Sequence, residues 1–207
     1  QNYNMEKKMS LIGQKAPDFT AQAVMENDEI TEMNLHDYLD GDYGLIFFYP
    51  LDFTFVCPSE IIAFSNRMDK FKELGCKVIG VSVDSQFSHY AWRNTAPEKG
   101  GIGSINFPLV ADLTKSIASD YDVLIEGAGV ALRGSFLIDK KGNIRHYVIN
   151  DLPLGRNVDE SIRMVEALQF HEEHGEVCPA GWNKGDEGMK PNAGGVASYL
   201  EGHAEKL

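Results

Sequence analysis

The sequence has few cysteines, and their number excludes one large class of proteins. Only three occur in 207 residues, Cys57, Cys76 and Cys178, and they lie far apart along the chain. Small secreted domains that depend on disulfides have more thiols at closer spacing. In a reducing compartment, cysteines with a function are more often catalytic or metal-binding than structural. The thiols are therefore candidates for chemistry, and a disulfide scaffold is excluded.

Basic residues and long apolar runs are also scarce. Nineteen lysines and arginines stand against 31 aspartates and glutamates, which gives a formal net charge of −12. This sign disfavours nucleic acid and anionic lipid as partners, since both bind positive charge. No run of about 18 apolar residues is present that would span a membrane. The start, QNYNMEKKMSLIG, lacks the apolar stretch of a signal peptide. We therefore expect a cytoplasmic protein without nucleic acid or membrane partners.

Apolar periodicity predicts strands and helices in alternation. Gly44–Pro50 is a continuous apolar run, typical of a strand that is covered on both faces. Further strands are predicted over residues 77–84, 107–112, 135–139 and 143–149, the last two joined as a hairpin by KKG. Helices are predicted over residues 58–74, 85–92, 115–120 and 158–174. This order predicts an α/β fold with a mixed central sheet flanked by helices.

The composition changes after the last of these helices. From Gly175 onward the chain is rich in glycine and proline, as in GEVCPAGWNKGDEGMKPNAGG, which is typical of an arm rather than of a core. We predict one domain over residues 9–174 and an extended C-terminal arm over residues 175–207, closed by a marginal helix. The leading QNYN precedes two candidate start residues, Met5 and Met9, and is left out of the predicted fold.

Cys57 stands where the apolar run ends and a helix begins, in FYPLDFTFVCPSE. The thiolate is the reactive form of cysteine, and a free thiol, with a pKa of about 8.5, is mostly protonated at neutral pH. The first backbone N–H groups of a helix have no partner within it and favour an anion. Pro58 suits the first turn because it has no N–H to satisfy, and Thr54 offers a hydroxyl to the sulfur. Two interpretations stay open on these grounds, a poised nucleophile and an inert cysteine at the edge of the core.

Several segments together resemble the peroxiredoxins. The motif Pro-x-x-x-Thr-x-x-Cys of that family matches Pro50, Thr54 and Cys57. LRGSFLID carries the arginine that the family places beside its thiolate, here Arg133, and NDLPLGRNVDE carries a second family arginine, Arg156. The chain is most similar to the thioredoxin peroxidases and alkyl hydroperoxide reductases. The resemblance implies a thioredoxin-like fold, which agrees with the predicted order of elements.

The resemblance also implies a thiol-dependent peroxidase that needs no metal, haem or flavin. Cys57 would attack hydrogen peroxide or a small organic hydroperoxide and become a sulfenic acid. By the same resemblance, Arg133 would hold the thiolate, Thr54 would orient the peroxide and Pro50 would shield the sulfur. Glu60 and Arg156 would position the guanidinium of Arg133.

HGEVCPAGW resembles the resolving-cysteine segment of the typical 2-Cys class. In that class the second thiol, here Cys178, condenses with the sulfenic acid of the partner subunit. Thioredoxin or a dedicated disulfide reductase then restores both thiols. The resemblance therefore implies a homodimer, which in this family often assembles into a decamer. Two other functions stay open beside the peroxidase: a holdase chaperone regulated by peroxide, and a redox relay that oxidises a partner protein.

Other signals are discounted or concern regulation. Cys76 has no motif around it and is interpreted as a small core residue. Glu60 stands where a CxxC motif would have its second cysteine, which disfavours a dithiol reductase. HEEH at residues 171–174 lacks the spacing of a zinc motif. GGIG at residues 100–103 resembles a loop of easily over-oxidised peroxiredoxins, but Tyr199 is followed by leucine instead of their phenylalanine. We expect the arm to pack less firmly over the active-site helix, and over-oxidation to be intermediate.

Overall fold

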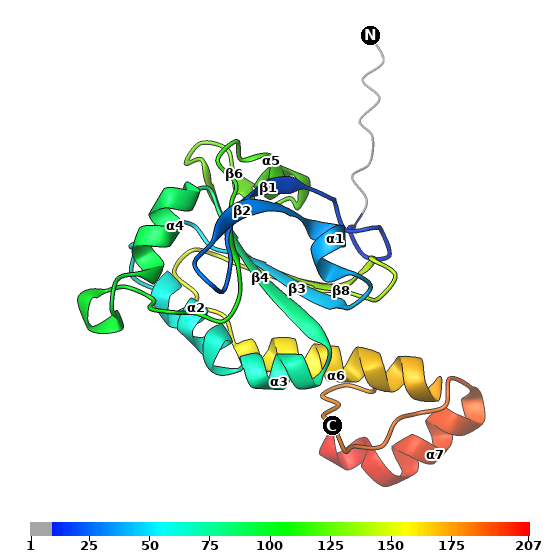
Figure 1. Cartoon of the computed structure of the whole chain (residues 1–207). Helices are drawn as coiled ribbons and strands as arrows, with labels where there is room; N and C mark the ends of the chain where they lie inside the picture. The colour runs from blue at the N-terminus through cyan, green and yellow to red at the C-terminus, as the bar shows by residue number, and fades with distance from the viewer. Residues whose placement is uncertain (1–9) are drawn as a thin grey trace.

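A seven-stranded mixed sheet lies at the centre of the computed structural model, which describes residues 10–207 (Figure 1). Its strands, in the order β2-β1-β5-β4-β3-β8-β9, are Ile30–Asn34, Thr20–Val24, Leu109–Ala111, Cys76–Ser82, Tyr43–Phe48, Arg133–Ile138 and Ile144–Asn150. β3 pairs in parallel with β4 and antiparallel with β8, so it is flanked on both edges. β6 (Leu124–Ile125) and β7 (Val130–Ala131) form a separate two-stranded sheet.

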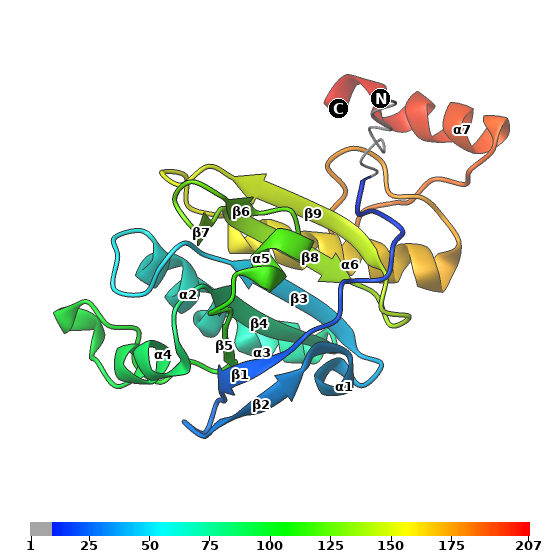
Figure 2. The ribbon, with the colours of Figure 1, turned by 90° about the horizontal axis from the view of Figure 1, so that it is seen from above.

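Helices cover both faces of the sheet. They are α1 (Leu35–Leu39), α2 (Cys57–Asn66), α3 (Met68–Glu73), α4 (Gln86–Arg93), α5 (Ser116–Asp120), α6 (Val158–His174) and α7 (Ala193–His203), with short 3-10 turns at Pro97–Lys99 and Ala204–Lys206. Figure 2 shows α5 in front of the sheet and α6 behind it. Buried side chains of α2, α3, α4 and α6 share one core, and those of α1 and α5 belong to a second core on the opposite face. The α/β fold with a mixed sheet and flanking helices is therefore confirmed.

The continuous apolar run of β3 follows from this two-sided covering. Leu45 and Phe47 belong to the core under α2 and α6, whereas Ile46 and Phe48 belong to the core under α1 and α5. Successive side chains of a strand point to opposite faces, so a strand in this position needs an apolar residue at every place. β3 therefore ends deep inside the molecule, and the loop that follows it begins in a buried environment.

Two parts of the predicted fold need correction. The helix predicted over residues 58–74 is divided into α2 and α3 at Arg67, whose backbone (φ −108°, ψ 8°) leaves helical values. The side chain of Arg67 turns instead to α6, where its Nε donates to Asp159 at 2.6 Å. The sequence prediction also missed α1 and the β1–β2 hairpin. The hairpin adds two strands to one end of the sheet.

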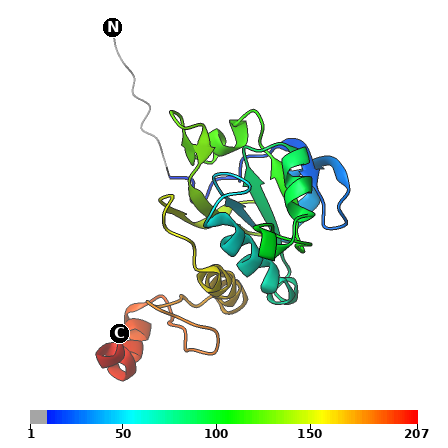
Figure 3. The ribbon, with the colours of Figure 1, turned by 90° about the vertical axis from the view of Figure 1, so that its left-hand side faces the viewer.

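The chain leaves the body of the molecule after α6. Gly175 ends this 17-residue helix with a left-handed backbone (φ 68°), and residues 175–207 then run back beside the C-terminal half of α6 (Figures 1 and 3). A short antiparallel bridge joins Val177 to Met189, and α7 closes the arm. Met5 and Met9, and with them the first residue of the predicted domain, lie outside the described residues.

Candidate active site

Cys57 is the first residue of α2 and lies at the end of the loop that follows β3. Its side chain is completely buried. Pro58 occupies the first turn of the helix, where a missing N–H leaves no unsatisfied intrahelical bond. The eight loop residues between Phe48 and Cys57 bend the chain from the sheet to the helix. The predicted strand-to-helix junction is therefore where the thiol lies.

Two donors contact the sulfur of Cys57. Oγ1 of Thr54 lies 3.2 Å from Sγ and 2.8 Å from the carbonyl oxygen of Leu51, so its single proton is shared between these two acceptors. Nη1 of Arg133 also lies 3.2 Å from Sγ and carries a permanent positive charge. Hydrogen bonds from a cation to an anion are stronger than neutral ones. A hydroxyl and a guanidinium therefore both lie against the sulfur of Cys57 at a fully buried position.

Glu60 joins two arginines into one buried network. Its Oε1 accepts from Nη1 of Arg133 at 2.6 Å and from Nη2 of Arg156 at 3.1 Å. Its Oε2 accepts from Nε of Arg156 at 2.7 Å and from the Arg156 backbone N–H at 3.0 Å. Removing one partner from such a buried pair leaves an uncompensated charge and costs about 3–5 kcal/mol. The carboxylate therefore fixes the guanidinium of Arg133 against the sulfur.

Each arginine also bonds to the backbone: Arg133 to the segment between β9 and α6, and Arg156 to β8. Nε of Arg133 donates to the carbonyl of Leu152 at 2.7 Å. Nη1 of Arg156 donates to the carbonyl of Gly134 at 2.8 Å, and its guanidinium lies over the ring of Phe47 at 5.0 Å. Burial lowers the pKa of Arg156, and the contacts with Glu60 oppose that shift. The structure thus brings five predicted residues together, those at positions 54, 57, 60, 133 and 156.

Pro50 is buried at the start of the same loop. It follows Tyr49, a fully buried residue of the core under α2. Its position in the loop agrees with the motif that pointed to it. The shielding of the sulfur by this proline stays a prediction.

Cys178 lies apart from this site, on the arm. Its thiol donates to the carbonyl of Ala167 on α6 at 3.3 Å, and it is half-buried. Burial raises the pKa of Cys178, and the guanidinium of Arg163 partly opposes that shift. Cys57 and Cys178 are both free thiols in this conformation. The structure therefore does not bring the two cysteines of one chain together.

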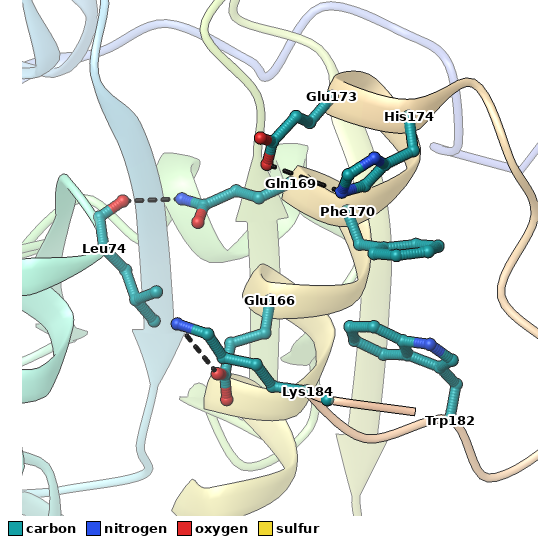
Figure 4. Close-up of a pocket in the computed structure, with 9 residues that line it drawn as sticks. Leu74, Glu166, Gln169, Phe170, Glu173, His174, Trp182 and Lys184 are labelled. Carbon is teal, nitrogen blue, oxygen red and sulfur yellow. Dashed lines mark hydrogen bonds and ion pairs between the residues drawn. The ribbon is translucent and has the colours of Figure 1, made fainter. Parts of the chain in front are cut away.

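Trp182 anchors the arm on α6 (Figure 4). Its side chain is almost fully buried, and its ring packs on that of Phe170 with centroids 4.8 Å apart. Its carbonyl accepts from Nη1 of Arg163 at 2.7 Å. Lys184 lies 3.9 Å from Glu166 and adds an ion pair between the arm and the helix. These contacts hold the segment that carries Cys178 along α6.

The sequence prediction missed a second polar network on the other side of the loop. Oδ1 of Asp52 accepts from the Tyr49 hydroxyl at 2.7 Å, and its Oδ2 lies 2.7 Å from Nδ1 of His89 on α4. Tyr49 and His89 are completely buried. Burial, and then the charge of Asp52, raises the pKa of Tyr49 well above its ordinary value, so the phenol stays a donor. A histidine on the buried face of an amphipathic helix was the signal available in the sequence.

The discounted signals lie away from both networks. Cys76 is buried in the core, and burial raises the pKa of its thiol, as expected for an inert cysteine. His171 and His174 are exposed at the end of α6. Among residues 10–207, no three histidine, cysteine, aspartate or glutamate side chains gather as a metal site would require. Over the same residues, no helix combines the length and apolar character needed to cross a bilayer.

α7 lies beside the C-terminal half of α6 and away from α2 (Figure 1). Within one chain, the arm therefore does not cover the helix that carries Cys57. The predicted packing of the arm, with Tyr199 and Leu200, over that helix is not seen within one chain. It stays a prediction, as does the intermediate over-oxidation that depends on it.

Comparisons with known proteins agree on one family. The model of the AhpC/TSA family matches residues 12–147, and that of the C-terminal domain of 1-Cys peroxiredoxin matches residues 167–202. Alkyl hydroperoxide reductase C of Helicobacter pylori is 60% identical over 198 residues, which cover 95% of this chain and 100% of that protein. Peroxiredoxin-2 of Mus musculus is 55% identical over 192 residues, which cover 93% and 96% of the two chains.

A solved structure extends the similarity to the whole fold. The reduced 2-Cys peroxiredoxin of Plasmodium vivax superposes with a TM-score of 0.91 at 48% sequence identity, and the match covers 93% of this chain and 100% of that one. The match reaches into the arm, because 93% coverage exceeds what the sheet and helices up to α6 supply. The fold, including its C-terminal extension, is therefore shared with a protein that is named as a 2-Cys peroxiredoxin.

Proposed function

This chain belongs to the AhpC/TSA family of peroxiredoxins and is a thiol-dependent peroxidase, and on that premise we propose that Cys57 is the thiol that peroxide oxidises and Cys178 the thiol that resolves it. The observation that carries the proposal is the pair of donors on the Cys57 sulfur, Thr54 and Arg133, each 3.2 Å from Sγ. An inert core cysteine has no need of a buried guanidinium. Cys76, which contacts no cation, provides the contrast within the same molecule.

In the first step the thiolate of Cys57 attacks one oxygen of the hydroperoxide. A sulfur–oxygen bond forms, the O–O bond breaks, and two electrons pass from sulfur to the peroxide. The departing oxygen takes a proton and leaves as water or an alcohol, while Cys57 becomes a sulfenic acid. Arg133 stabilises the charge that develops on the oxygens, and Thr54 supplies a hydrogen bond that orients them.

Three further residues shape the site. Glu60 and Arg156 hold the guanidinium of Arg133 in place, a role supported by the four hydrogen bonds that Glu60 accepts from the two arginines. Pro50 limits the access of water and of bulky substrates, which is supported by its burial at the start of the loop. Hydrogen peroxide and small organic hydroperoxides are thus the substrates of choice. A neutral substrate needs no attracting field, so the net charge of −12 is no obstacle.

In the second step Cys178 of a partner subunit condenses with the sulfenic acid, forming a disulfide and releasing water. The location of Cys178 beside Ala167 supports a partner as its source. Cys178 contacts α6 in this conformation, whereas Cys57 contacts Thr54 and Arg133, and both thiols are free. A dithiol of the thioredoxin type then reduces the disulfide by exchange. A dithiol of this type is kept reduced only in a reducing compartment, which supports a cytoplasmic location for this protein.

A homodimer and a larger ring are supported by two surfaces. Among the strands that the structure describes, β9 is last in the sheet. Gly13 and Gln14 bond to the backbone of Ile144 at its start, and the edge beyond Ile144 is left for a second copy. Exposed apolar side chains also lie on the loop before Cys57, on α4 and after β5, and we group them as one aromatic surface: Phe53, Phe55, Phe87, Tyr90 and Leu113. Phe55 is 98% exposed, which is unfavourable unless another surface covers it. We assign the β9 edge to the dimer and the aromatic surface to a decamer.

A non-reducing gel after one equivalent of peroxide tests the two-cysteine assignment. Wild-type protein is expected to shift to a disulfide-linked dimer, and so is Cys76→Ser. Cys57→Ser is expected to stay monomeric on the gel. Cys178→Ser is expected to stay monomeric as well, but to acquire a sulfenic acid that a dimedone probe traps at Cys57. A linked dimer in Cys178→Ser, or its loss in Cys76→Ser, would contradict the assignment.

A further inference from the structure

Asp52 ties the loop before Cys57 to α4 and to the segment that follows β4. Besides its contacts with Tyr49 and His89, its Oδ2 accepts from the hydroxyl of Ser88 on α4 at 2.9 Å. Its backbone N–H donates to Oδ2 of Asp84, after β4, at 2.9 Å. The residue is 7% exposed, although it belongs to a loop. Asp52 therefore links the loop to α4 through its side chain and to the segment after β4 through its backbone N–H.

The contact with His89 holds a single shared proton. Nε2 of His89 lies 2.9 Å from the carbonyl oxygen of Val110, which only accepts, so Nε2 carries a hydrogen. Nδ1 and Oδ2 of Asp52 then face each other at 2.7 Å with one proton between them. The pair has no net charge whichever atom holds this proton. Such a pair is compatible with complete burial, and it is a strong, directional contact.

The loop needs an external restraint at this point. Phe53, directly after Asp52, has a left-handed backbone (φ 56°), which a non-glycine residue adopts only when its surroundings impose it. Its ring lies 5.8 Å from that of Trp92 on α4. Thr54 follows and places its hydroxyl 3.2 Å from the Cys57 sulfur. The contacts of Asp52 with α4 therefore determine where Thr54 lies.

The same contacts oppose the movement that the second step requires. Cys57 is completely buried, so its sulfenic acid meets a second thiol only after the loop and the first turn of α2 have opened. Opening separates Asp52 from His89 and breaks a buried, charge-compensated pair. A stronger pair thus favours the closed loop, and a weaker pair favours the open one.

We propose that Asp52 and His89 are positioning residues that hold the loop of residues 49–56 in its peroxide-reactive conformation and thereby set the balance between oxidation of Cys57 and its resolution. This inference rests on the proposed roles of Cys57 and Cys178. Weakening the pair slows the first step, since Thr54 is no longer held against the sulfur. It accelerates the second, since the loop opens more readily. It also reduces further oxidation to the sulfinic acid, because that reaction competes with resolution.

Stopped-flow fluorescence measures both steps, because Trp92 contacts the loop. In Asp52→Ala we expect oxidation of Cys57 to slow by about tenfold, the size of effect that misplacement of a reacting group produces, while disulfide formation becomes faster. Asp52→Asn keeps an acceptor for Tyr49 and offers an N–H to neutral His89, so both rate constants stay within about threefold of wild type. Mass spectrometry under excess peroxide is expected to show less sulfinic acid in Asp52→Ala than in wild type.

Two further variants keep the test decisive. Ser88→Ala removes one hydrogen bond from Oδ2 of Asp52. It is expected to slow oxidation of Cys57 and to accelerate disulfide formation, each by roughly threefold. Asp139→Ala removes another buried aspartate, which accepts from two backbone N–H groups at the far end of β8, and is expected to change neither rate constant. The inference is overturned when Asp52→Ala and Ser88→Ala slow both the oxidation of Cys57 and disulfide formation. It is also overturned when neither variant changes either rate constant. Failure of peroxide to oxidise Cys57 in the wild type overturns the proposed function instead.

Discussion

At the scale of single residues, the site depends on one carboxylate between two guanidinium groups. Glu60 faces Arg133 through one oxygen and Arg156 through both, and the three side chains are almost fully buried. Arginine presents its N–H donors in a fixed plane, so two oxygens of one carboxylate determine the orientation of each group. The contact between Arg133 and the sulfur is therefore an outcome of the whole network.

Arg156→Lys is expected to weaken this network while it retains the charge. A lysine cannot reproduce the bonds to both oxygens of Glu60 or the contact with the ring of Phe47. We expect Cys57 oxidation to slow by about tenfold and the free energy of unfolding to fall by about 3 kcal/mol, measured by stopped flow and urea titration. Arg145→Lys is the control, since its ion pair with Asp139 is partly exposed and changes stability by less than about 1 kcal/mol. Equal effects of the two changes would contradict the role given to Arg156.

The pH dependence of the second step follows from Cys178. Burial raises the pKa of this thiol, so at neutral pH the nucleophilic thiolate is the minor form. Disulfide formation is therefore expected to accelerate as pH rises, by about tenfold per pH unit below the pKa. Arg163→Gln removes the charge that opposes the shift and is expected to slow disulfide formation at pH 7 while the first step stays unchanged. Quenched-flow alkylation and mass spectrometry follow both steps, and a flat pH profile would exclude the assignment.

Single residues also show how far the sequence leads. Cys57, Thr54 and Arg133 were found because their segments match a family motif. Asp52 and His89 were not, because they lie 37 positions apart and nothing in their local patterns indicates that they meet. Contacts between distant segments depend on the packing of α4 against the sheet, which periodicity alone does not define.

At the scale of elements, continuous periodicity conceals interruptions. Ile61, Phe64, Met68 and Phe71 all belong to one core, and they lie on opposite sides of the break at Arg67. Their spacing therefore predicts one helix where two short ones pack against the same surface. The β1–β2 hairpin was missed for the opposite reason, since its strands are half-exposed and carry few large apolar residues. β3, by contrast, is buried on both faces and was easily predicted.

The arm is an element whose attachment is testable. Trp182 fills the contact with Phe170, so Trp182→Ala is expected to loosen the segment that carries Cys178. Alkylation of Cys178 in the reduced protein then becomes faster by roughly tenfold, while oxidation of Cys57 by peroxide is unaffected. Leu200→Ala, a truncation on the partly exposed face of α7, serves as the control. Unchanged alkylation in Trp182→Ala would show that the ring does not hold the arm.

At the scale of the whole molecule, we propose two surfaces for other copies of the chain. The open edge of β9 belongs to the sheet, and the aromatic surface around Phe55 belongs to the loop that precedes Cys57. The first offers backbone hydrogen bonds and the second offers apolar area. Association through the second surface therefore places a neighbouring subunit directly against the loop that must open during turnover.

Phe55→Glu is expected to abolish the larger assembly and leave dimers. A carboxylate at a buried contact loses its hydration without gaining a partner, which costs several kcal/mol in each interface (about 2–5). Sedimentation velocity is expected to show a dimer for this variant and a ring for the wild type. Val196→Glu, on the exposed side of α7, is the control and retains the ring. Rings that persist in Phe55→Glu would place the contact elsewhere.

The open β9 edge has a consequence for the newly made chain. Without a second copy, we expect the backbone donors and acceptors along the edge of β9 beyond Ile144 to pair with other extended polypeptides, including unfinished copies of the chain. Arg145 and His146, at the start of this strand, act as charged or polar gatekeepers that discourage indiscriminate recruitment. We therefore expect synthesis that outpaces assembly to favour aggregation through this edge.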